Sequence, residues 1–330
     1  MPPTPPRPPA QILAELTNAH VVTRCLHVLA DFGVADALGD EPTTTAELAA
    51  RTGLNADALE RILRLVAAHD VFVPQDAGYA HTPTSRLLRS DHPQSLLPLV
   101  RMRSLPAMWN GLTNLAHAAR TGQPLSDWTA LMSYFAAHPT EAAIFDAAMT
   151  AKSLRVNPAV VDAYDFSALR VVADIGGGRG HLLQAILARN PQTTGVLFDV
   201  PHVLDNAAEI ASPRLRLVAG DFFVDPLPVA DAYVLMDLLH DWSDADVARI
   251  LGAVRRTAPA HARVLIVETL VAEQPGPHFG KTLDIIMLAV TGGRERTPTE
   301  LGALLAAAGL RLQRVLPTAS EYSVVEAVVA

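Results

Sequence analysis

The sequence predicts an α/β protein, with an open, mostly parallel, Rossmann-like sheet in the C-terminal half and a mostly helical N-terminal half. After residue 166, short β-branched runs alternate with helical patterns, which is typical of βαβ units. Before residue 96, a helix, turn, helix and hairpin pattern is typical of a winged helix. The expected parts are a disordered Pro-rich tail (1–9), a winged-helix-like domain (10–95), a helical linker or lid (96–165) and a Rossmann-like domain (166–330).

Composition limits the classes of partner. The 330 residues are 50% hydrophobic and carry a net charge of -8, with 26 dispersed Lys and Arg. A nucleic-acid partner would need a basic face, so we expect none. No apolar run approaches the roughly 20 residues that span a bilayer, and the N-terminus lacks a signal-peptide core, so we expect no membrane partner. The single cysteine, Cys25, excludes a disulfide framework and predicts a cytoplasmic protein.

The N-terminal domain starts with helical patterns. Six prolines in residues 1–9 predict a disordered tail, with ordered structure from near Ala10. Apolar residues at helical spacing from Ile12 to Phe32 predict one or two helices before Gly33. They supply more apolar surface than a single flanking helix needs.

A winged-helix pattern follows, which raises the alternative of a DNA-binding regulator. Capping residues at Thr44 and Asn55 predict two short helices, and a hairpin is expected over 71–74 and 79–82. The second helix carries two basic and two acidic residues: Arg61, Arg64, Asp57 and Glu60. Because phosphate contacts need net positive charge, this nearly neutral helix disfavours DNA binding.

The linker is predicted to be helical from 93 to 163. Pro139 and Pro158 are each expected in the first turn of a helix, the latter behind a capping Asn157. Lys152 and Arg155 are expected to be solvated charges.

A glycine-rich turn opens the C-terminal domain. A β-branched run from Val171 ends just after Asp174, passes glycines at 176, 178 and 180, and enters an apolar helical run at His181. Glycines permit positive φ and let a ligand lie against the backbone. The dinucleotide pattern G-x-G-x-x-G would place glycine at 181, so a different ligand is indicated.

The next strands end in residues suited to a nucleoside. The strand 195–199 ends in Asp199, where a carboxylate accepts hydrogen bonds from two ribose hydroxyls. A third strand leads to Asp221 and Phe222, which could hold an adenine edge and face. Further strands and helices are expected at 215–218, 232–236, 244–257, 263–268, 281–290, from Pro298 to before Gly309, 311–316 and 322–329.

Five motifs in order resemble the S-adenosylmethionine-dependent O-methyltransferases of the caffeate and hydroxyindole type, which include bacterial natural-product enzymes. The motifs are Asp-Ile-Gly-Gly-Gly-x-Gly, Phe-Asp-Val-Pro, Gly-Asp-Phe-Phe, Leu-His-Asp-Trp-Ser-Asp and Gly-Gly-Arg-Glu-Arg-Thr (292–297). The resemblance implies a class I methyltransferase domain closed by an antiparallel hairpin. It also implies a homodimer through the N-terminal domain and an aromatic, phenolic or quinonoid, polyketide-like acceptor. The cofactor would be S-adenosylmethionine, with S-adenosylhomocysteine as product, and no metal site is expected.

His240 is the expected general base. It follows the fourth strand at the carboxyl end, where the ligand crevice of an open α/β sheet lies. An imidazole with a pKa of about 6.5 can take the proton of a phenol whose pKa is about 10. Glu268 and Glu295 are the candidates to hold its other nitrogen. Asp241 is either a second catalytic carboxylate or a helix-entry residue.

The resemblance also implies the remaining site residues. Phe145 and Met149 would clamp a planar acceptor, together with Asp284 and Met287 as substrate contacts. Met236 stands where many relatives have a basic residue. The expected cofactor contacts are Asp174, Gly176, Gly178, Asp199, Asp221, Phe222 and Met236.

Some relatives bind the cofactor without transferring its methyl group. They catalyse hydroxylation, decarboxylation or pericyclic rearrangement instead, which is the alternative function here. The presence of His240, Glu268 and Glu295 favours methylation.

Overall fold

The computed structural model describes residues 8–330, apart from the side chain of Asn206. The predicted tail therefore lies almost wholly outside the described residues. The chain divides into two compact units. The first runs to Trp109 and includes His138–Ala151, and the second comprises Asn110–Ala137 and Lys152–Ala330.

The first unit has the predicted winged-helix order. A single long helix begins at Pro9, one residue before the expected start, because proline is tolerated in a first helical turn. Thr44 and Asn55 cap the next two long helices as predicted. The elements are α1 (Pro9–Asp31), α2 (Val34–Leu38), α3 (Thr45–Thr52), α4 (Ala56–Ala67), β1 (Phe72–Gln75), β2 (Gly78–His81) and α5 (Pro83–Arg86).

Apolar faces of these elements form one core. Leu48, Leu63 and Phe72, from α3, α4 and β1, are almost completely buried in it. The antiparallel pairing of β1 with β2 forms the predicted wing.

Helices fill the linker region, with one departure from the sequence prediction. They are α6 (Leu97–Ser104), α7 (Pro106–Thr113), α8 (Leu115–Thr121), α9 (Trp128–Ala137) and α10 (Pro139–Ala163). Pro158 was predicted to start a helix behind a capping Asn157, and this is wrong, because α10 continues through it. Val156, Val160 and Val161 bury this part of α10 in the core, so packing outweighs the hydrogen bond that proline cannot make.

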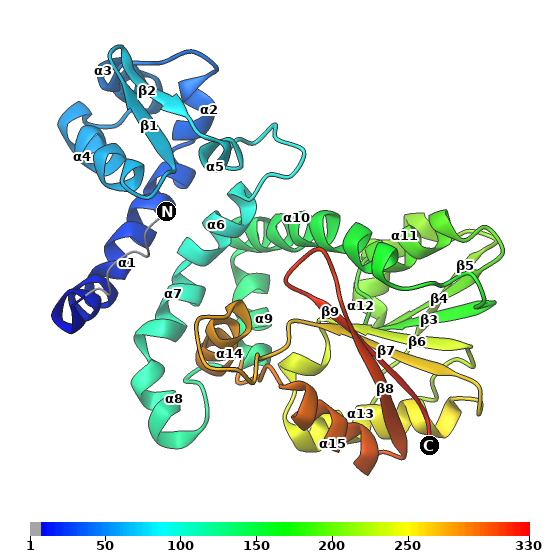
Figure 1. The fold of residues 1–330 in the computed structure, drawn as a ribbon. Helices are drawn as coiled ribbons and strands as arrows, with labels where there is room; N and C mark the ends of the chain where they lie inside the picture. Colours follow the sequence, from blue (N-terminus) through cyan, green and yellow to red (C-terminus); the bar gives the residue numbers. More distant parts are fainter. Residues whose placement is uncertain (1–7) are drawn as a thin grey trace, which may run out of the picture. The chain divides into compact units, whose positions relative to one another are not determined.

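The second unit is built on a seven-stranded sheet in the order β5-β4-β3-β6-β7-β9-β8 (Figure 1). All neighbours are parallel except those of β9, which runs antiparallel to β7 and β8, as the predicted closing hairpin requires. The strands are β3 (Val171–Ile175), β4 (Thr194–Asp199), β5 (Leu215–Ala219), β6 (Ala232–Met236), β7 (Arg263–Glu268), β8 (Leu310–Pro317) and β9 (Ser323–Val329).

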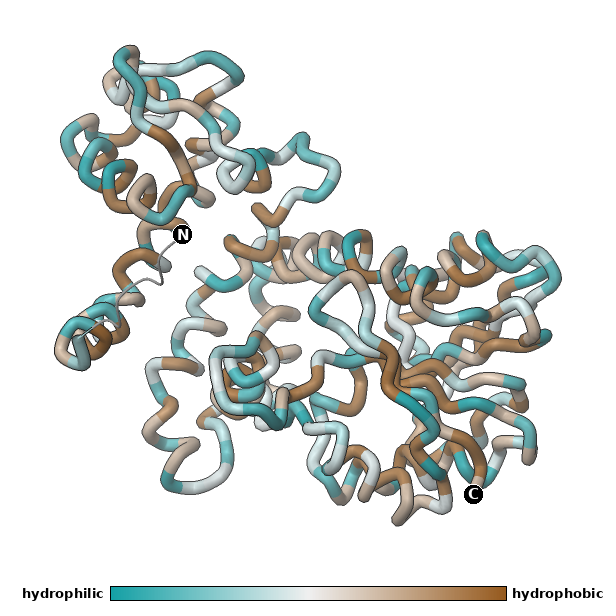
Figure 2. Tube along the Cα trace, viewed as in Figure 1, coloured by the Kyte–Doolittle hydropathy of each residue, from teal (hydrophilic) through white to brown (hydrophobic). Residues whose placement is uncertain are grey.

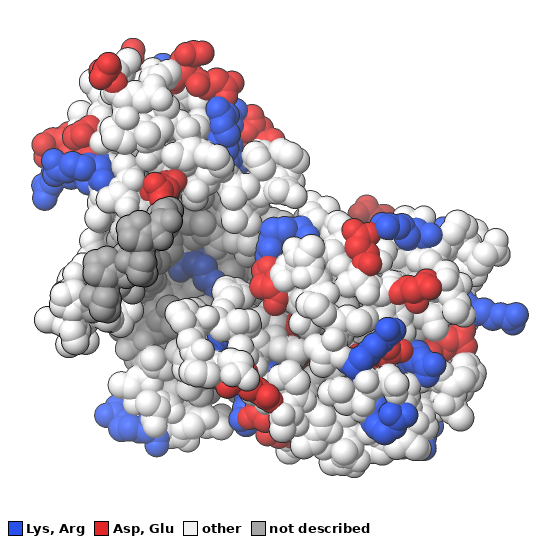
Figure 3. Space-filling view, viewed as in Figure 1, with Lys and Arg blue, Asp and Glu red and all other residues white. Residues whose placement is uncertain are grey.

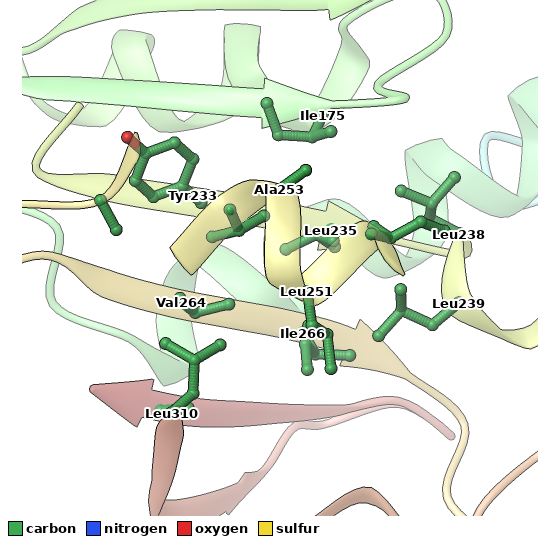
Figure 4. Packing of buried hydrophobic residues seen from close by; sticks show 14 of the residues in the cluster. Ile175, Tyr233, Leu235, Leu238, Leu239, Leu251, Ala253, Val264, Ile266 and Leu310 are labelled. Carbon is green, nitrogen blue, oxygen red and sulfur yellow. The ribbon is translucent and has the colours of Figure 1, made fainter. Parts of the chain in front are cut away.

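Helices cover both faces of this sheet, and the strands read as apolar runs because both faces are buried (Figure 2). Along β6, Tyr233 and Leu235 face the core under α13 and α15, as Figure 4 shows, whereas Val234 faces the core under α10, α11 and α12. The covering helices are α11 (His181–Arg189), α12 (Pro201–Leu204), α13 (Asp244–Thr257) and α15 (Pro298–Ala307).

Surface charge is mixed. On the face shown in Figure 3, basic and acidic side chains lie interspersed. None of the helices between residues 8 and 330 is both long and apolar enough to cross a bilayer.

Candidate active site

The topology brings acidic residues together at one edge of the sheet. The strand order runs outward in both directions from β3 and β6, so the switch point lies between these strands. Ligands of open α/β sheets bind at the carboxyl ends of the strands at such a point. Four neighbouring strands contribute an acid at or just after this edge: Asp174, Asp199, Asp237 and Glu268.

The glycine turn after β3 leaves backbone exposed to a ligand. Gly176 and Gly178 have φ of 66° and 59°, and nothing lies within 4 Å of a Cβ built on Gly178. The Gly178 N–H donates to Oδ2 of Asp199 at 2.9 Å. Gly177 cannot carry a side chain, because its Cβ would lie 2.4 Å from Cγ of Asp174. The turn is therefore a cradle between β3 and α11.

Asp174 lies beneath that turn with unmet hydrogen-bonding capacity. Its side chain is buried, and its Oδ1 has no hydrogen-bond partner within residues 8–330. Burial, with the nearby charge of Asp199, raises the pKa of Asp174 to about 7. Such a carboxyl is suited to accept hydrogen bonds from a ligand that enters the cradle.

The predicted adenine contacts lie at the ends of β5 and β6. Asp221 accepts the N–H of Phe223 at 2.8 Å, and Phe222 packs edge-on against Phe223 and Trp242. Met236, the last residue of β6, packs partly buried against the core.

His240 lies in a short 3-10 turn, η2 (Leu239–Asp241), after β6. Its Nδ1 lies 2.8 Å from Oε1 of Glu295, and its backbone N–H donates to Oε1 of Glu268 at 3.0 Å. Of the two candidate carboxylates, Glu295 therefore holds the imidazole, whereas Glu268 holds the backbone. Nε2 of His240 lies 3.8 Å from Oδ1 of Asp241.

The pKa of His240 lies above the ordinary imidazole value of about 6.5. Burial by itself lowers the pKa of this imidazole, but the charges of Asp241, Glu295 and Asp237 more than compensate and raise it to about 10. The imidazole is therefore protonated at neutral pH. Burial also raises the pKa of Glu268, to about 7.

The segment after α14 (Phe279–Val290) supports the histidine from behind. Asp284 accepts the backbone N–H of Glu295 at 3.0 Å, and the N–H of Arg294 donates to the carbonyl of His240 at 2.6 Å. The backbone carbonyl of Met287 accepts the N–H groups of Thr291 and Gly292 at the end of α14. Asp284 and Met287, which were predicted as substrate contacts, lie next to the loop that carries Glu295 and bond to its backbone.

Substitution of Gly293 tests this packing. A Cβ at Gly293 would lie 2.0 Å from the carbonyl oxygen of His240, and backbone cannot yield as a flexible side chain can. We expect Gly293→Ala to lower the free energy of unfolding by about 1 to 3 kcal/mol and to reduce kcat, because His240 must shift. Denaturant titration measures the free energy of unfolding, and initial rates at saturating substrates measure kcat. Gly302→Ala is the matched control, since its Cβ meets no atom closer than 3.7 Å; equal losses in the two variants would contradict the packing argument.

Arg296 is a supporting residue that the sequence analysis missed. Its side chain is 1% exposed and donates to the carbonyls of Leu239 and Trp242 and to Oδ1 of Asp244. It thus clamps both ends of the turn that carries His240. It lies within the motif Gly-Gly-Arg-Glu-Arg-Thr (292–297), which could have drawn attention to it, but a local motif does not predict burial.

Lys152 and Arg155 are not the solvated charges that the sequence suggested. Nζ of Lys152 lies 2.8 Å from Oδ2 of Asp237, and Arg155 makes a bidentate pair with Glu321. Both pairs involve residues far apart in the sequence. Phe145 and Met149, one turn apart and partly buried, lie on the part of α10 that belongs to the first compact unit.

Comparison with known proteins decides the family. Residues 112–311 match the O-methyltransferase domain, and residues 14–91 match the O-methyltransferase dimerisation domain. The chain belongs to the O-methyltransferase family. It is an S-adenosylmethionine-dependent O-methyltransferase, which confirms the resemblance and the predicted fold class.

Individual relatives are similar over nearly their full lengths. The methyltransferase is 41% identical over 329 residues to phenazine O-methyltransferase of Lysobacter antibioticus, covering 97% of this chain and 96% of the relative. It is 35% identical to 8-amino-8-demethylriboflavin N,N-dimethyltransferase of Streptomyces davaonensis, covering 98% and 96%. The structure of a methyltransferase in calicheamicin biosynthesis, in its SAH-bound form, aligns with a TM-score of 0.90 and 38% identity, covering 97% and 98%.

The site of the methyltransferase fits a bound nucleoside with a charged amino acid group. Among residues 8–330, one buried carboxylate oxygen of Asp174 and one of Glu295 have no hydrogen-bond partner. The buried Nε1 of Trp242 has none either. The open space at Gly178 and the carboxylate of Asp199 lie beside Asp174. Asp174, Asp199 and the backbone at Gly178 thus supply acceptors and exposed backbone beside the switch point.

Proposed function

We propose that this methyltransferase transfers a methyl group to a hydroxyl of an aromatic small molecule, with His240 as the general base. The 2.8 Å contact between Nδ1 of His240 and Glu295 carries the proposal. Because Glu295 accepts the proton on Nδ1, the tautomer left after deprotonation has its free lone pair on Nε2.

The cofactor contacts follow from the cradle. We propose that Asp174, Gly176 and Gly178 hold the amino acid part of S-adenosylmethionine, Asp199 its ribose, and Asp221, Phe222 and Met236 its adenine. When bound, this cofactor supplies a methyl group on a sulfonium. The acidic groups at the strand ends favour a cationic ligand at this edge.

The chain's own residues then remove the hydroxyl proton of the acceptor and stabilise the charge that results. Nε2 of His240 takes the hydroxyl proton, and Glu295 stabilises the imidazolium that results. Glu268 fixes the backbone of His240 and so positions the ring. Asp241, at 3.8 Å from Nε2, is the nearest described carboxylate to that nitrogen and adds to the same stabilisation.

The acceptor is proposed to be a planar phenolic or quinonoid ring system of polyketide type. The names of the similar proteins support this class, since phenazine and riboflavin are both fused ring systems. Phe145 and Met149 would contact the faces of the ring, with Asp284 and Met287 as further contacts.

Labelled S-adenosylmethionine tests the function. The protein is incubated with this donor and a panel of phenolic and quinonoid acceptors, and the products are analysed by mass spectrometry. We expect the label on oxygen. Label on no acceptor, with turnover of the acceptor by hydroxylation, decarboxylation or rearrangement, would support the non-methylating alternative.

A nitrogen acceptor is the second candidate. The 35% identity to an N,N-dimethyltransferase over 98% of this chain favours it. Amino analogues of each phenol in the panel distinguish the two, because the methyl group then appears on nitrogen.

The first unit is proposed to form a homodimer. The match of residues 14–91 to the O-methyltransferase dimerisation domain supports a homodimer. In addition, α1 leaves several large apolar side chains exposed. They are Ile12, Leu13, Leu16 and Val21. Covering such a face with a second copy removes it from water.

We propose a cytoplasmic, metal-independent enzyme. Cys25 carries a free thiol, which suits a reducing compartment. Since an imidazole and carboxylates can remove the hydroxyl proton of the acceptor without a metal ion, we expect EDTA to leave turnover unchanged. Loss of turnover in EDTA, with recovery in magnesium, would overturn this.

The pKa of His240 predicts a pH dependence. Because carboxylates raise this pKa to about 10, the imidazole gains its proton as the pH falls and then cannot act as a base. We expect kcat/KM to fall with decreasing pH, with an acid limb well above 6.5. If the limb instead follows the acceptor's own pKa across a series of substituted phenols, it belongs to the acceptor and not to His240.

A further inference from the structure

Asp237 adopts a strained conformation three residues before His240. Its φ is 49°, and the only other described non-glycine residue with positive φ is Asp70. Such a conformation costs on the order of 1 kcal/mol and persists where the surroundings impose it. It lies where β6 ends and the chain turns toward η2.

Two donors from distant parts of the chain hold this carboxylate. Nζ of Lys152, on α10, contacts Oδ2 at 2.8 Å, and the hydroxyl of Tyr322, just before β9, donates to Oδ1 at 2.8 Å. The side chains of Lys152 and Asp237 are only 20% and 16% exposed. Both carboxylate oxygens are thus fixed by charge-assisted hydrogen bonds.

The contacts of Asp237 and Tyr322 shift their pKa values in opposite directions. Burial alone would raise the pKa of Asp237, but Lys152, His240 and Tyr322 hold it below its usual value. Burial and the charge of Asp237 raise the pKa of Tyr322 well above its usual value. Asp237 is therefore a carboxylate, and Tyr322 keeps the proton that it donates.

Several charged groups face His240 from different elements. Asp241 follows it in η2, Glu295 contacts its ring from the loop after α14, and Asp237 precedes it at the end of β6. Glu268 on β7 bonds its backbone. Beyond these groups, Lys152 on α10 acts on Asp237 and Asp241, and Arg296 acts on Glu268.

We propose that Asp237, fixed by Lys152 and Tyr322, is a positioning residue that holds the turn carrying His240 and stabilises positive charge on its imidazole. Lys152 limits that stabilisation by partly neutralising Asp237. The catalytic consequence rests on the proposed role of His240 as general base.

Asp237→Asn tests the charge. Asparagine tolerates positive φ and keeps an oxygen acceptor, so the turn survives while the negative charge is lost. We expect the titration midpoint of His240 to fall by on the order of one pH unit. It is measured by NMR on protein labelled with ¹³C-histidine, ligand-free and with S-adenosylhomocysteine, between pH 5 and 11. The signal is assigned by its absence from His240→Gln.

Lys152→Met tests whether the midpoint of His240 shifts in the opposite direction when the cation is removed. Buried carboxyls reach a pKa of about 8 to 9, below the pH at which His240 titrates, so Asp237 remains charged in this variant. With the neutralising cation removed, we expect the midpoint of His240 to rise. If Asp237 had only a structural role, the midpoint of His240 should fall in both variants. A loosened turn would expose the imidazole to solvent and move its pKa toward the value of a free imidazole in water.

Asp231→Asn is the matched control. It also converts a partly buried aspartate to an amide, but this residue pairs with His261 and is not among the groups that set the pKa of His240 or Asp237. The midpoint of His240 in this variant should equal that of the wild type. A shift as large as that of Asp237→Asn, or the same direction of shift in Asp237→Asn and Lys152→Met, would overturn the proposal.

Activity separates this inference from the function on which it rests. With saturating S-adenosylmethionine, the acid limb of kcat/KM for the acceptor should move in the same direction as the midpoint measured with S-adenosylhomocysteine. Midpoints that move as expected while the acid limb stays in place would refute His240 as the base and leave the electrostatic coupling intact. Unchanged midpoints would refute the coupling, whatever the activity of His240→Gln.

Discussion

His240→Gln should lose about 10²- to 10⁴-fold in kcat, the usual contribution of a general base. Glutamine has a similar length and can still donate to Glu295, but its amide has no basic nitrogen that could take the proton of the acceptor. The cradle around Asp174 and Gly178 is untouched, so S-adenosylhomocysteine should bind with nearly unchanged affinity. Initial rates at saturating donor and calorimetry with the product measure the two effects.

A second histidine provides the control for this loss. His261 pairs with Asp231 near the amino ends of β6 and β7, away from the carboxyl edge, and its side chain is 69% exposed. His261→Gln should turn over at the wild-type rate. Near-wild-type turnover of His240→Gln would remove His240 from the role of base.

Arg296→Met should cause the largest loss of stability. The guanidinium is 1% exposed and satisfies the carbonyls of Leu239 and Trp242 as well as Asp244. Methionine fills a similar volume but leaves the carbonyls of Leu239 and Trp242 without this donor, and each unsatisfied buried acceptor costs about 1 to 3 kcal/mol. Urea titration measures the free energy of unfolding, and kcat should fall with it, because the turn carrying His240 loses its clamp.

The neighbouring arginine is the matched control. Arg294 is 51% exposed and pairs with Glu300 and Asp244 at the surface. Exposed pairs contribute about 0 to 1 kcal/mol, so Arg294→Met should be nearly neutral. If both variants lost the same stability, the buried clamp would not be the cause.

Local patterns predicted most of the elements in the second unit. The bounds of β6, β7 and α13 agree residue for residue with those expected, because each strand is a short apolar run and Ser243 caps the helix. The predicted helix start at Pro158 is wrong because tertiary packing outweighs the local preference of proline for a first helical turn. Burial of Val156 and Val160 keeps α10 continuous through this residue.

At the site, sequence order predicted which residues meet at the sheet edge but not how they pair. Glu268 and Glu295 were equivalent candidates for the imidazole, and the fold assigns the ring to Glu295 and the backbone N–H to Glu268. Lys152 looked solvated because its partner Asp237 lies 85 residues away.

The sequence by itself therefore determined the α/β class, the glycine cradle after Asp174 and the place of His240 at the carboxyl end of β6. These follow from periodicity, caps and strand ends, which are properties of neighbouring residues. Only the tertiary structure decided that Arg296 is buried, that Glu295 meets the imidazole and that Lys152 meets Asp237. Those contacts depend on how distant segments pack, and the same packing places the carboxylates that set the charge of His240.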